Sequence, residues 1–596
     1  MDAGDASRLI LSRTPLEPGE VVELLKPYGF LDPLRVDREL QALADLCPSR
    51  ERFARLFVPL LEAASRSPDP DAAIHRFHSY VAARGESSIL LEELERIEGL
   101  LEDLLFLLGG SEYLSAVLVR NPHYLEWLLE TNARDTAKNR EQMESELRDW
   151  VRRFRTPESR EGVLRQFKRR ESFRIGMRDL LGVADVEETL RETTALADAA
   201  LQVACELVQE QMEAKHGRPQ TEDGTPVSYV VIGMGKLGGE ELNYSSDIDI
   251  LFLYEEEGRT AQGLDNQTYF VRFTEELVRL LSQHHEEGYV FRVDLRLRPQ
   301  GETGALARSL DSYLGYYETW GELFDRQALI KARPCAGDLE LGRRFLRAVE
   351  PFVYRSIGSE EDIQTVLEEI FYSKLQGERR VARQGSPQLH LKWGPGGIRD
   401  VEFVVQALQL LHGGTVPEVR VRPTLEAIHA LAQRGYLSSS DAEALRRGYR
   451  FLRRAENMVQ LVADRQEYAL PDDPTEWRRF ALRLGYHDRP GNPAEEQFRS
   501  ELQAHQRAVR EVFQRVFAFE PDPFRDRMDE ILQDSSEITP EAEAFLRGIG
   551  IEEVPTAVRW LRELARGSAR VRFTPRIRRQ FLKFCSSSVG GAAFGS

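Results

Sequence analysis

VVIGMGKLGGEELNYSSDIDILFLY, residues 230–254, is the most informative stretch of this 596-residue chain. Its pattern predicts a strand, a glycine-rich loop and a second strand from Ile248 to Tyr254. Because side chains alternate along a strand, Asp247 and Asp249 lie on the same face. Two carboxylates held that close repel each other unless a cation lies between them, and hard cations such as Mg²⁺ prefer carboxylate oxygens. The stretch therefore predicts a magnesium site where the second strand begins.

The loop between the two strands is rich in glycine, which allows a tight turn whose backbone N–H groups approach a phosphate. Its glycines are Gly233, Gly235, Gly238 and Gly239, and Lys236 adds a positive charge beside them. We expect this loop to contact phosphate.

A third carboxylate follows after a gap of helical length. In YVFRVDLRLRP, residues 289–299, apolar and polar side chains alternate, so that Asp294 shares a face with Arg292, Arg296 and Arg298. The alternation predicts a strand whose polar face meets a metal and an anionic ligand together. A lone Asp-x-Asp is more often a solvated loop or a strand edge. The glycine loop, the paired aspartates and this third aspartate together favour a catalytic site.

Length and composition limit the class of protein. The length corresponds to about three to four domains of ~150 residues each. The composition is 41% hydrophobic and 30% charged, no apolar run approaches the ~20 residues of a membrane span, and the N-terminus lacks a signal-peptide pattern. A formal net charge of -18 argues against nucleic-acid binding, because phosphate contacts need clustered Lys and Arg. We expect a soluble cytoplasmic protein whose four cysteines are free thiols, namely Cys47, Cys205, Cys335 and Cys585.

Periodicity divides the chain into helical and mixed regions. We expect a mostly helical α+β protein with a small mixed sheet in the catalytic domain. In that domain, helices are predicted over residues 187–215 and 266–285. The predicted domains are an N-terminal helical domain (1–180), the catalytic domain (181–340), a helical bundle (341–520) and a helical linker remnant with a low-complexity disordered tail (521–596).

Two further segments have alternative interpretations. Residues 164–175, LRQFKRRESFRI, form the most basic stretch before the catalytic domain. An ordinary exposed helix face is favoured there, and a phosphate or partner contact is the alternative. An aromatic cluster at helical spacing is expected to lie in a core, with nucleotide stacking as the alternative, and it consists of Tyr313, Tyr316, Tyr317 and Trp320.

Four motifs together resemble one known family. GKLGG at 235–239, NYSSDID at 243–249, RVDLRLRP at 292–299 and KWGPGGIRDVEF at 392–403 are similar to patterns of the glutamine synthetase adenylyltransferase/adenylyl-removing enzymes. That family lies in the nucleotidyltransferase superfamily that includes DNA polymerase β. The resemblance implies a polymerase β-like catalytic domain flanked by helical domains, the later one similar to the helical domain of uridylyltransferases. One departure occurs at residues 324–326, Phe-Asp-Arg, where the family usually has Trp-Glu-Arg.

The resemblance also implies roles for individual residues. Two Mg²⁺ ions would be held by Asp247, Asp249 and Asp294. Nucleotide and phosphate would be bound by Gly235, Lys236, Gly238, Gly239, Ser246, Arg296, Arg298 and Lys331. An ion-paired structural role is the alternative for Lys331, as it is for Arg326 and Arg333. Near the same cleft the resemblance places Lys392, Arg399, Asp400 and Glu402.

The family's enzymes carry two such halves, and the sequence after residue 412 contains no second glycine loop with Asp-x-Asp. We interpret the chain as either a natural one-domain form or the N-terminal half of a longer gene. Its motifs are more similar to the removing half, which implies that phosphate takes AMP from a tyrosine of glutamine synthetase and ADP is released. One alternative is the transfer of AMP from ATP to that tyrosine. Others are a non-catalytic binder of glutamine synthetase or of the PII signal protein, and a nucleotidyltransferase acting on RNA, which the acidic balance disfavours.

Overall fold

In the computed structural model the chain divides into two compact units, Met1–Val516 and Phe517–Ser596. The first unit is mostly helical and contains a small mixed sheet, as the sequence predicted. The predicted disordered tail falls largely on residues outside the described part of the chain. The structure describes residues 9–11, 16–85, 87–285, 287–383, 385, 387–518, 531, 538, 540–548, 551 and 553–566.

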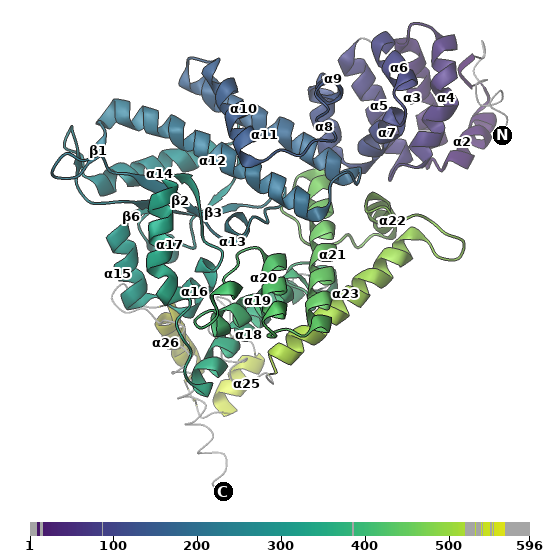
Figure 1. Ribbon diagram of the computed structural model, residues 1–596. Coiled ribbons are helices and arrows are strands. Elements are labelled where there is room, and N and C mark those ends of the chain that lie inside the picture. Colours follow the sequence, from purple (N-terminus) through teal and green to yellow (C-terminus); the bar gives the residue numbers. More distant parts are fainter. Residues whose placement is uncertain are drawn as a thin grey trace. The chain divides into compact units, whose positions relative to one another are not determined.

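The first unit begins with a series of short helices (Figure 1). Polar N-caps fix where several of them start: the carboxylate of Asp69, for example, accepts a hydrogen bond from the N–H of Ala72. No helix in the described residues is long and apolar enough to cross a membrane. The elements are α2 (Pro18–Leu25), η1 (Lys26–Tyr28), α3 (Pro33–Leu46), α4 (Arg50–Ser65), α5 (Pro70–Arg84), α6 (Ser87–Arg96), α7 (Leu100–Gly110), α8 (Glu112–Arg120) and α9 (Tyr124–Glu130).

Three further helices follow, namely α10 (Arg140–Arg152), α11 (Pro157–Leu180) and α12 (Val186–His216), of which α11 and α12 are longer than any helix before them. The last of these confirms the helix predicted over 187–215. Its start is capped by Asp185, whose carboxylate accepts from a backbone N–H of the first turn.

Helix α11 corrects the interpretation of the basic stretch, because residues 164–175 are mostly buried and do not form an exposed face. Arg174 is 0% exposed, and its guanidinium donates to the carboxylates of Glu171 and Glu192. Burial of Arg170, Glu171 and Arg174 is tolerated because each has an oppositely charged partner, and one of these partners, Glu192, lies on α12. We call this cluster the α11 ion network, and its members are Lys138, Glu146, Arg170, Glu171, Arg174, Arg178 and Glu192.

The mixed sheet of the first unit contains both strands predicted from residues 230–254. Strand β3 is antiparallel to β2 and parallel to both β5 and β6, and β2 is also antiparallel to β7. The strands are β2 (Tyr229–Gly233), β3 (Ile248–Tyr254), β5 (Val293–Asp294), β6 (Ala307–Ser309) and β7 (Arg333–Gly337). A separate small antiparallel pair is formed by β1 (Pro219–Gln220) and β4 (Arg259–Thr260).

Helices cover both faces of this sheet (Figure 1). Val231 of β2 packs into the core shared with α12 and with α14 (Asn266–Ser282), which agrees with the second predicted helix. The neighbouring Val230 faces the other side, because side chains alternate along a strand. There it meets α17 (Leu339–Val353), and a Cβ at Gly342 would lie only 3.0 Å from Val230 Cγ2. The sheet is therefore a buried, rigid support for the residues at its ends.

Residues 289–299 do not form the continuous strand that their alternation predicted. Only Val293 and Asp294 pair with β3. Arg298 is buried and donates to the backbone carbonyls of Gly304 and Glu302. Alternation of polar and apolar residues also fits an irregular segment with one buried side, so the pattern overestimated the strand length.

The rest of the first unit is again helical. In α15, Tyr313 and Tyr317 are buried as expected, whereas Trp320 is 68% exposed. Helices α21 and α23 pack side by side. The elements are η2 (Gly301–Thr303), α15 (Leu310–Trp320), α16 (Leu323–Leu329), α18 (Glu360–Ala382), η3 (Pro387–Leu389), α19 (Ile398–His412), η4 (Pro417–Val419), α20 (Thr424–Gln433), α21 (Ser439–Ala463), α22 (Pro474–Arg483) and α23 (Ala494–Val516).

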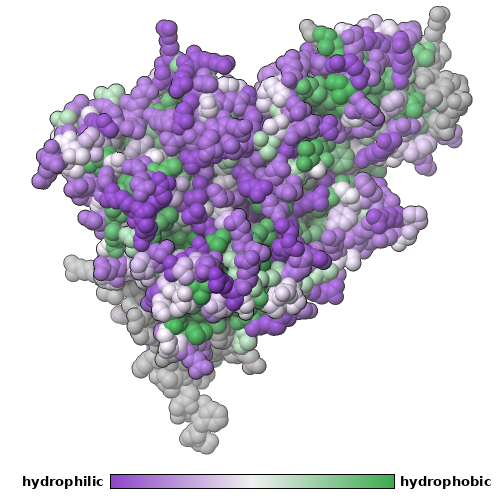
Figure 2. All heavy atoms as spheres, viewed as in Figure 1, coloured by the Kyte–Doolittle hydropathy of each residue, from purple (hydrophilic) through white to green (hydrophobic). Residues whose placement is uncertain are grey.

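The second unit has two described helices, α25 (Pro540–Gly548) and α26 (Val554–Arg566). They share a small apolar cluster formed by Ile531, Ala542, Leu546, Val554 and Val558. The face of the molecule in Figure 2 is mainly hydrophilic with scattered apolar patches. Three of the cysteines are free thiols as predicted, namely Cys47, Cys205 and Cys335, whereas Cys585 is outside the described residues.

Candidate active site

A cavity of about 370 Å³ lies beside the ends of β3 and β5, and helices α16, α18 and α19 contribute its other walls. We call it the aspartate cavity. It brings together eight of the residues that the sequence singled out, namely Gly235, Lys236, Ser246, Asp247, Asp249, Asp294, Arg296 and Lys331. The lining does not include three others, Gly238, Gly239 and Arg298.

Strand register places two of the carboxylates next to each other. Asp249 and Asp294 are direct partners in the parallel pair of β3 and β5, and neighbouring strands are about 4.8 Å apart. Gly235 has a positive φ of 51°, and a Cβ there would lie 2.7 Å from the Oδ2 atom of Asp249. A larger residue would be strained and would also collide with the carboxylate, so glycine is required for the loop to pass this closely.

Asp249 carries an unrelieved negative charge. Burial, together with the nearby charges of Asp294 and Asp247, raises the pKa of Asp249 to about 6. Among the described residues, no hydrogen-bond donor or ion-pair partner contacts its carboxylate. The cationic groups of Lys392 and Arg399 act in the opposite direction but do not bond to it. Such a carboxylate is suited to bind a cation.

The other two carboxylates have arginine partners. Arg292 donates to Asp247 at 2.6 Å, and Arg296 donates to both oxygens of Asp294. Although burial opposes it, the hydrogen bonds from Arg296 lower the pKa of Asp294. Among the described residues, no group of three or more His, Cys, Asp or Glu side chains is gathered closely enough to hold a metal ion.

Lys236 is anchored to a helix that lies far away in the sequence. Its ammonium donates to Glu456 of α21 at 2.8 Å and to Asn243 at 2.6 Å. Asn243 in turn donates to Glu456. Burial lowers the pKa of Lys236 to about 7, and Glu456 partly counteracts this effect. Glu456 therefore holds both the lysine and the loop before Asp247 in place, and no local motif indicated this residue.

Four of the predicted phosphate contacts have other roles in the structure. The glycine loop contains one helical turn, α13 (Gly235–Gly238), and the N–H groups of Gly238 and Gly239 donate within it. Gly238 is required because a Cβ there would lie 2.0 Å from the carbonyl oxygen of Lys331. Lys331 itself lines the cavity but its ammonium donates to Glu241 and Thr424, and Arg298 bonds to backbone carbonyls as described above.

Two further basic residues discussed with Lys331 are structural. Arg326 donates to the carbonyl of Val353, and Arg333 donates to Asp198. Both are buried and neither lines the aspartate cavity.

Another part of the cavity lining is cationic and aromatic. The ammonium of Lys392 lies 4.4 Å from the ring centroid of Tyr468, and the guanidinium of Arg399 lies 5.3 Å from that of Trp393. Arg399 also donates to Glu402, and although burial opposes it, Arg399 and nearby lysines lower the pKa of Glu402 to about 2. The motif at 392–403 pointed to this region, and Lys392, Arg399 and Glu402 do line the cavity. Asp400 does not, since it pairs with Lys374 and Arg510.

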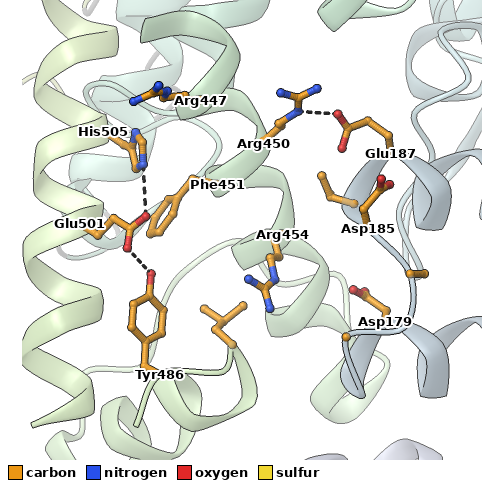
Figure 3. Close-up of a pocket in the computed structure, with 14 residues that line it drawn as sticks. Asp179, Asp185, Glu187, Arg447, Arg450, Phe451, Arg454, Tyr486, Glu501 and His505 are labelled. Carbon is orange, nitrogen blue, oxygen red and sulfur yellow. Dashed lines mark hydrogen bonds and ion pairs between the residues drawn. The ribbon is translucent and has the colours of Figure 1, made fainter. Parts of the chain in front are cut away.

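A larger cavity of about 740 Å³ lies elsewhere, between the end of α11, the start of α12, and helices α21 and α23 (Figure 3). Several of its charged side chains have partners: Arg450 pairs with Glu187, and Glu501 accepts a hydrogen bond from Tyr486. Asp179 projects into it and accepts a hydrogen bond from Tyr244. It contains none of the three predicted metal carboxylates, so size alone does not identify the active site.

The glycine turn, the parallel pairing of Asp249 with Asp294 and the cationic residues in the same cavity are features of a nucleotidyltransferase domain. Comparison with known proteins agrees. Residues 101–348 match the family glutamate-ammonia ligase adenylyltransferase, and residues 371–517 match the family GlnD PII-uridylyltransferase. The chain therefore carries a domain of the glutamate-ammonia ligase adenylyltransferase family, which confirms the resemblance inferred from the motifs.

Individual relatives carry the name bifunctional glutamine synthetase adenylyltransferase/adenylyl-removing enzyme. The protein of Thioalkalivibrio sulfidiphilus is 34% identical over 485 residues, which are 78% of this chain and 48% of that protein. The protein of Nitrosococcus oceani is 39% identical over 379 residues, 62% of this chain and 37% of the relative. That of Streptomyces coelicolor is 33% identical over 570 residues, 94% of this chain and 53% of the relative. The chain spans about half the length of the curated relatives it matches.

Proposed function

We propose that this chain removes AMP from adenylylated glutamine synthetase by phosphorolysis. The names of its relatives support glutamine synthetase as the protein substrate. The motifs around Asp247, Asp249 and Asp294 are more similar to the removing half of the family than to the transferring half. The single observation on which the proposal depends is the unpaired carboxylate of Asp249, in one cavity with cationic and aromatic residues.

The donor set of the cavity fits Mg²⁺. Asp247, Asp249 and Asp294 offer carboxylate oxygens, which hard divalent cations prefer. Asp249 has no competing partner among the described residues, whereas Asp247 and Asp294 would have to exchange Arg292 and Arg296 for metal. When bound, the metal would neutralise phosphate charge and orient the attacking and leaving oxygens.

The remaining lining residues would bind and orient the reactants. Lys392 has no ion-pair partner among the described residues and faces the cavity, so it would bind a phosphate oxygen. Arg296, once released from Asp294, would do the same. The rings of Trp393 and Tyr468 offer surfaces on which adenine stacks.

The proposed reaction forms one bond and breaks one. An oxygen of inorganic phosphate attacks the phosphorus of the adenylyl group, which produces ADP. The bond from that phosphorus to the tyrosyl oxygen breaks, and the phenolate takes up a proton. The substrates would be adenylylated glutamine synthetase and phosphate, and ATP would be the AMP donor only in the opposite reaction. Control by the PII signal protein is a further expectation from the resemblance.

A paired assay on the whole chain tests the proposal. In the first reaction, adenylylated glutamine synthetase, Mg²⁺ and phosphate are incubated with the chain, and ADP release is measured. In the second, unmodified glutamine synthetase and labelled ATP are used, and label on the protein is measured. Asp249→Asn serves as the inactive control, with its fold verified by circular dichroism.

We expect phosphate-dependent ADP release with little labelling. Labelling without phosphorolysis would replace the proposal with AMP transfer, which is the direction named first in the relatives. No turnover in either reaction, with binding to glutamine synthetase retained, would indicate a regulatory binder. Full turnover by Asp249→Asn would refute the assignment of the cavity as the active site.

A further inference from the structure

A third cavity, of about 250 Å³, lies where α8, α11 and the turn before Tyr289 meet. We call it the basic cavity. It shares no lining residue with the aspartate cavity. Its charged lining consists of four cations and two carboxylates, namely Arg120, Arg165, Lys168, Arg169, Glu287 and Asp464.

Two of these cations are almost fully buried and have no partner. Arg165 is 7% exposed and Lys168 is 8% exposed. Within the described part of the chain, neither side chain makes a hydrogen bond or an ion pair, and Nε and Nη1 of Arg165 are buried without an acceptor. The ammonium of Lys168 faces only the rings of Tyr289 and Phe291, at 5.8 and 5.9 Å. Glu286, in the adjoining turn, is outside the described residues.

Neither carboxylate of the cavity bonds to Arg165 or Lys168, and Oε2 of Glu287 is buried without a donor. Asp464 accepts a hydrogen bond from the Ser245 hydroxyl, and Glu287 accepts one from Gln166. Arg169 donates to the backbone carbonyl of Glu287 and not to its carboxylate. The basic cavity therefore has an excess of positive charge that the described residues do not balance.

An unpaired buried charge is costly, because removal from water is not offset by a partner. Several other buried or cavity-lining cations of the molecule avoid this cost. On the same helix, Arg174 has two carboxylate partners, and in the larger cavity of Figure 3, Arg450 is paired with Glu187. Arg326 is a further buried cation whose Nη atoms have no acceptor, but it lines neither the basic cavity nor the aspartate cavity. In the basic cavity, an external anion would satisfy Arg165 and Lys168 at once.

We propose that the basic cavity binds a small phosphate-type oxyanion, either free inorganic phosphate or a single phosphate group of a metabolite. Guanidinium and ammonium groups are the usual protein ligands of phosphate. The volume is below the roughly 300 to 1,000 Å³ of pockets that enclose drug-sized ligands, which favours a small anion.

Hydrogen bonds connect this cavity to the catalytic loop. Asp464 accepts from Ser245 at 2.6 Å, and the hydroxyl of Tyr289 accepts from Arg292 at 2.6 Å. Arg292 also holds Asp247. An anion beside Tyr289 would therefore lie two hydrogen bonds, through Arg292, from the predicted metal carboxylate Asp247.

The test is direct binding of inorganic phosphate to the whole chain by isothermal titration calorimetry, without divalent cations and at constant ionic strength. The variant is Arg165→Met/Lys168→Met, which removes both charges and keeps most of the side-chain volume. Arg152→Met, at an exposed ion pair on α10, is the charge-matched control. Asp249→Asn is a second control that alters only the aspartate cavity. The thermal midpoint of each protein is measured without phosphate, and AMP is titrated in parallel.

We expect phosphate to bind the wild type, Arg152→Met and Asp249→Asn, and its affinity to fall at least about tenfold in the double variant. Without phosphate, the double variant should melt at the same temperature as the wild type or higher, since two unpaired buried charges are gone. If AMP binds and inorganic phosphate does not, and if AMP binding depends on Arg165 and Lys168 in the same way, the proposal is supported. The ligand would then be the phosphate group of a metabolite and not free phosphate.

Three results would overturn the proposal. The first is the absence of phosphate and AMP binding to the wild type. The second is phosphate binding that the double variant retains, which would assign the anion to another site. The third is a thermal midpoint of the double variant several degrees below the wild type without phosphate, which would show that the two cations have a structural role.

Discussion

The aspartate cavity and the α11 ion network both concentrate charge inside the first unit, but they satisfy it differently. In the network, Arg174 and Glu171 are buried and bonded to each other. In the cavity, Asp249 faces like charges, and its pKa is raised to about 6 by burial and by Asp294. A structural cluster is stabilised when every buried charge has a partner. A site whose charges are only partly paired can still bind a ligand, but the unpaired charges lower the stability of the protein.

This contrast predicts opposite responses to neutralisation. Removing a charge from the network leaves a partner buried and unpaired, so the protein should lose stability. Removing Asp249 relieves a repulsion, so stability should rise while turnover is lost. The following experiments test this difference.

Asp249→Asn should produce the largest effect. We expect ADP release to fall at least about a thousandfold, because the carboxylate that has no protein partner is the main candidate to hold the metal. The free energy of unfolding at pH 7.5 should increase by about 1 to 2 kcal/mol, since repulsion among the carboxylates decreases. Urea denaturation measures the second quantity. Asp311→Asn, at an exposed position of α15, should change neither, and a destabilised Asp249→Asn protein would contradict the comparison.

Arg174→Met should have the reverse effect. Glu171 and Glu192 would remain buried without this partner, so we expect the free energy of unfolding to fall by about 3 to 5 kcal/mol. The urea midpoint, followed by circular dichroism, measures it. Arg152→Met removes an exposed pair and should cost no more than about 1 kcal/mol. Equal effects of the two variants would show that the network is not a structural cluster.

Glu456→Gln tests the connection between the cavity and α21. Without this carboxylate the pKa of Lys236 should fall below about 7, because Glu456 raises it. We expect ADP release at pH 7.5 to decrease about 10- to 100-fold, as for other residues that hold functional groups in place. The loss should be smaller at pH 6, where Lys236 is protonated again. The control is Glu443→Gln, at a half-exposed position of the same helix. A loss of activity that does not depend on pH would indicate unfolding instead.

Asp179→Asn should give the smallest effect, and it tests whether a buried carboxylate without an ion-pair partner lowers stability outside the aspartate cavity as well. Asp179 belongs to α11 but has only a hydrogen bond from Tyr244, and burial raises its pKa to about 6. Its contribution to stability is therefore complete below about pH 4 and is lost as the pH rises through 6. The variant should gain up to about 2 kcal/mol relative to the wild type between pH 4 and 7. Urea midpoints across this range measure the difference, and parallel pH curves would contradict the assignment.

The sequence predicted the part of the site that depends on local periodicity. Asp247 and Asp249 lie at the start of a strand, and the spacing to Asp294 allowed a helix between two strands. The sequence therefore predicted that Asp294 lies next to the paired aspartates, as the pairing of Asp249 with Asp294 shows. The length of the strand over 289–299 was overestimated. Alternation of polar and apolar residues indicates which side chains share a face, but it does not indicate whether the backbone has a neighbouring strand to bond to. Which site residues bind magnesium and phosphate stays a prediction.

Long-range pairing could not be predicted in the same way. The basic stretch 164–175 resembles a solvated helix face, and its burial depends on carboxylates of other helices, such as Glu192. Likewise, nothing near Lys236 indicates that its partner is Glu456, which is 220 residues away. Charge patterns report composition along one element, whereas burial depends on which elements meet.

The bond between Asn243 and Glu456 spans 213 residues, which has a consequence for synthesis. At roughly 5 to 20 residues per second, the loop leaves the ribosome about 10 to 40 s before α21 is made. During that interval the sheet and its aspartates exist without the helix that holds the loop. Nascent chains arrested before residue 439 should therefore be cleaved by protease within 235–247, and chains extended past α23 should resist it. The timing of translation thus determines when the site becomes competent.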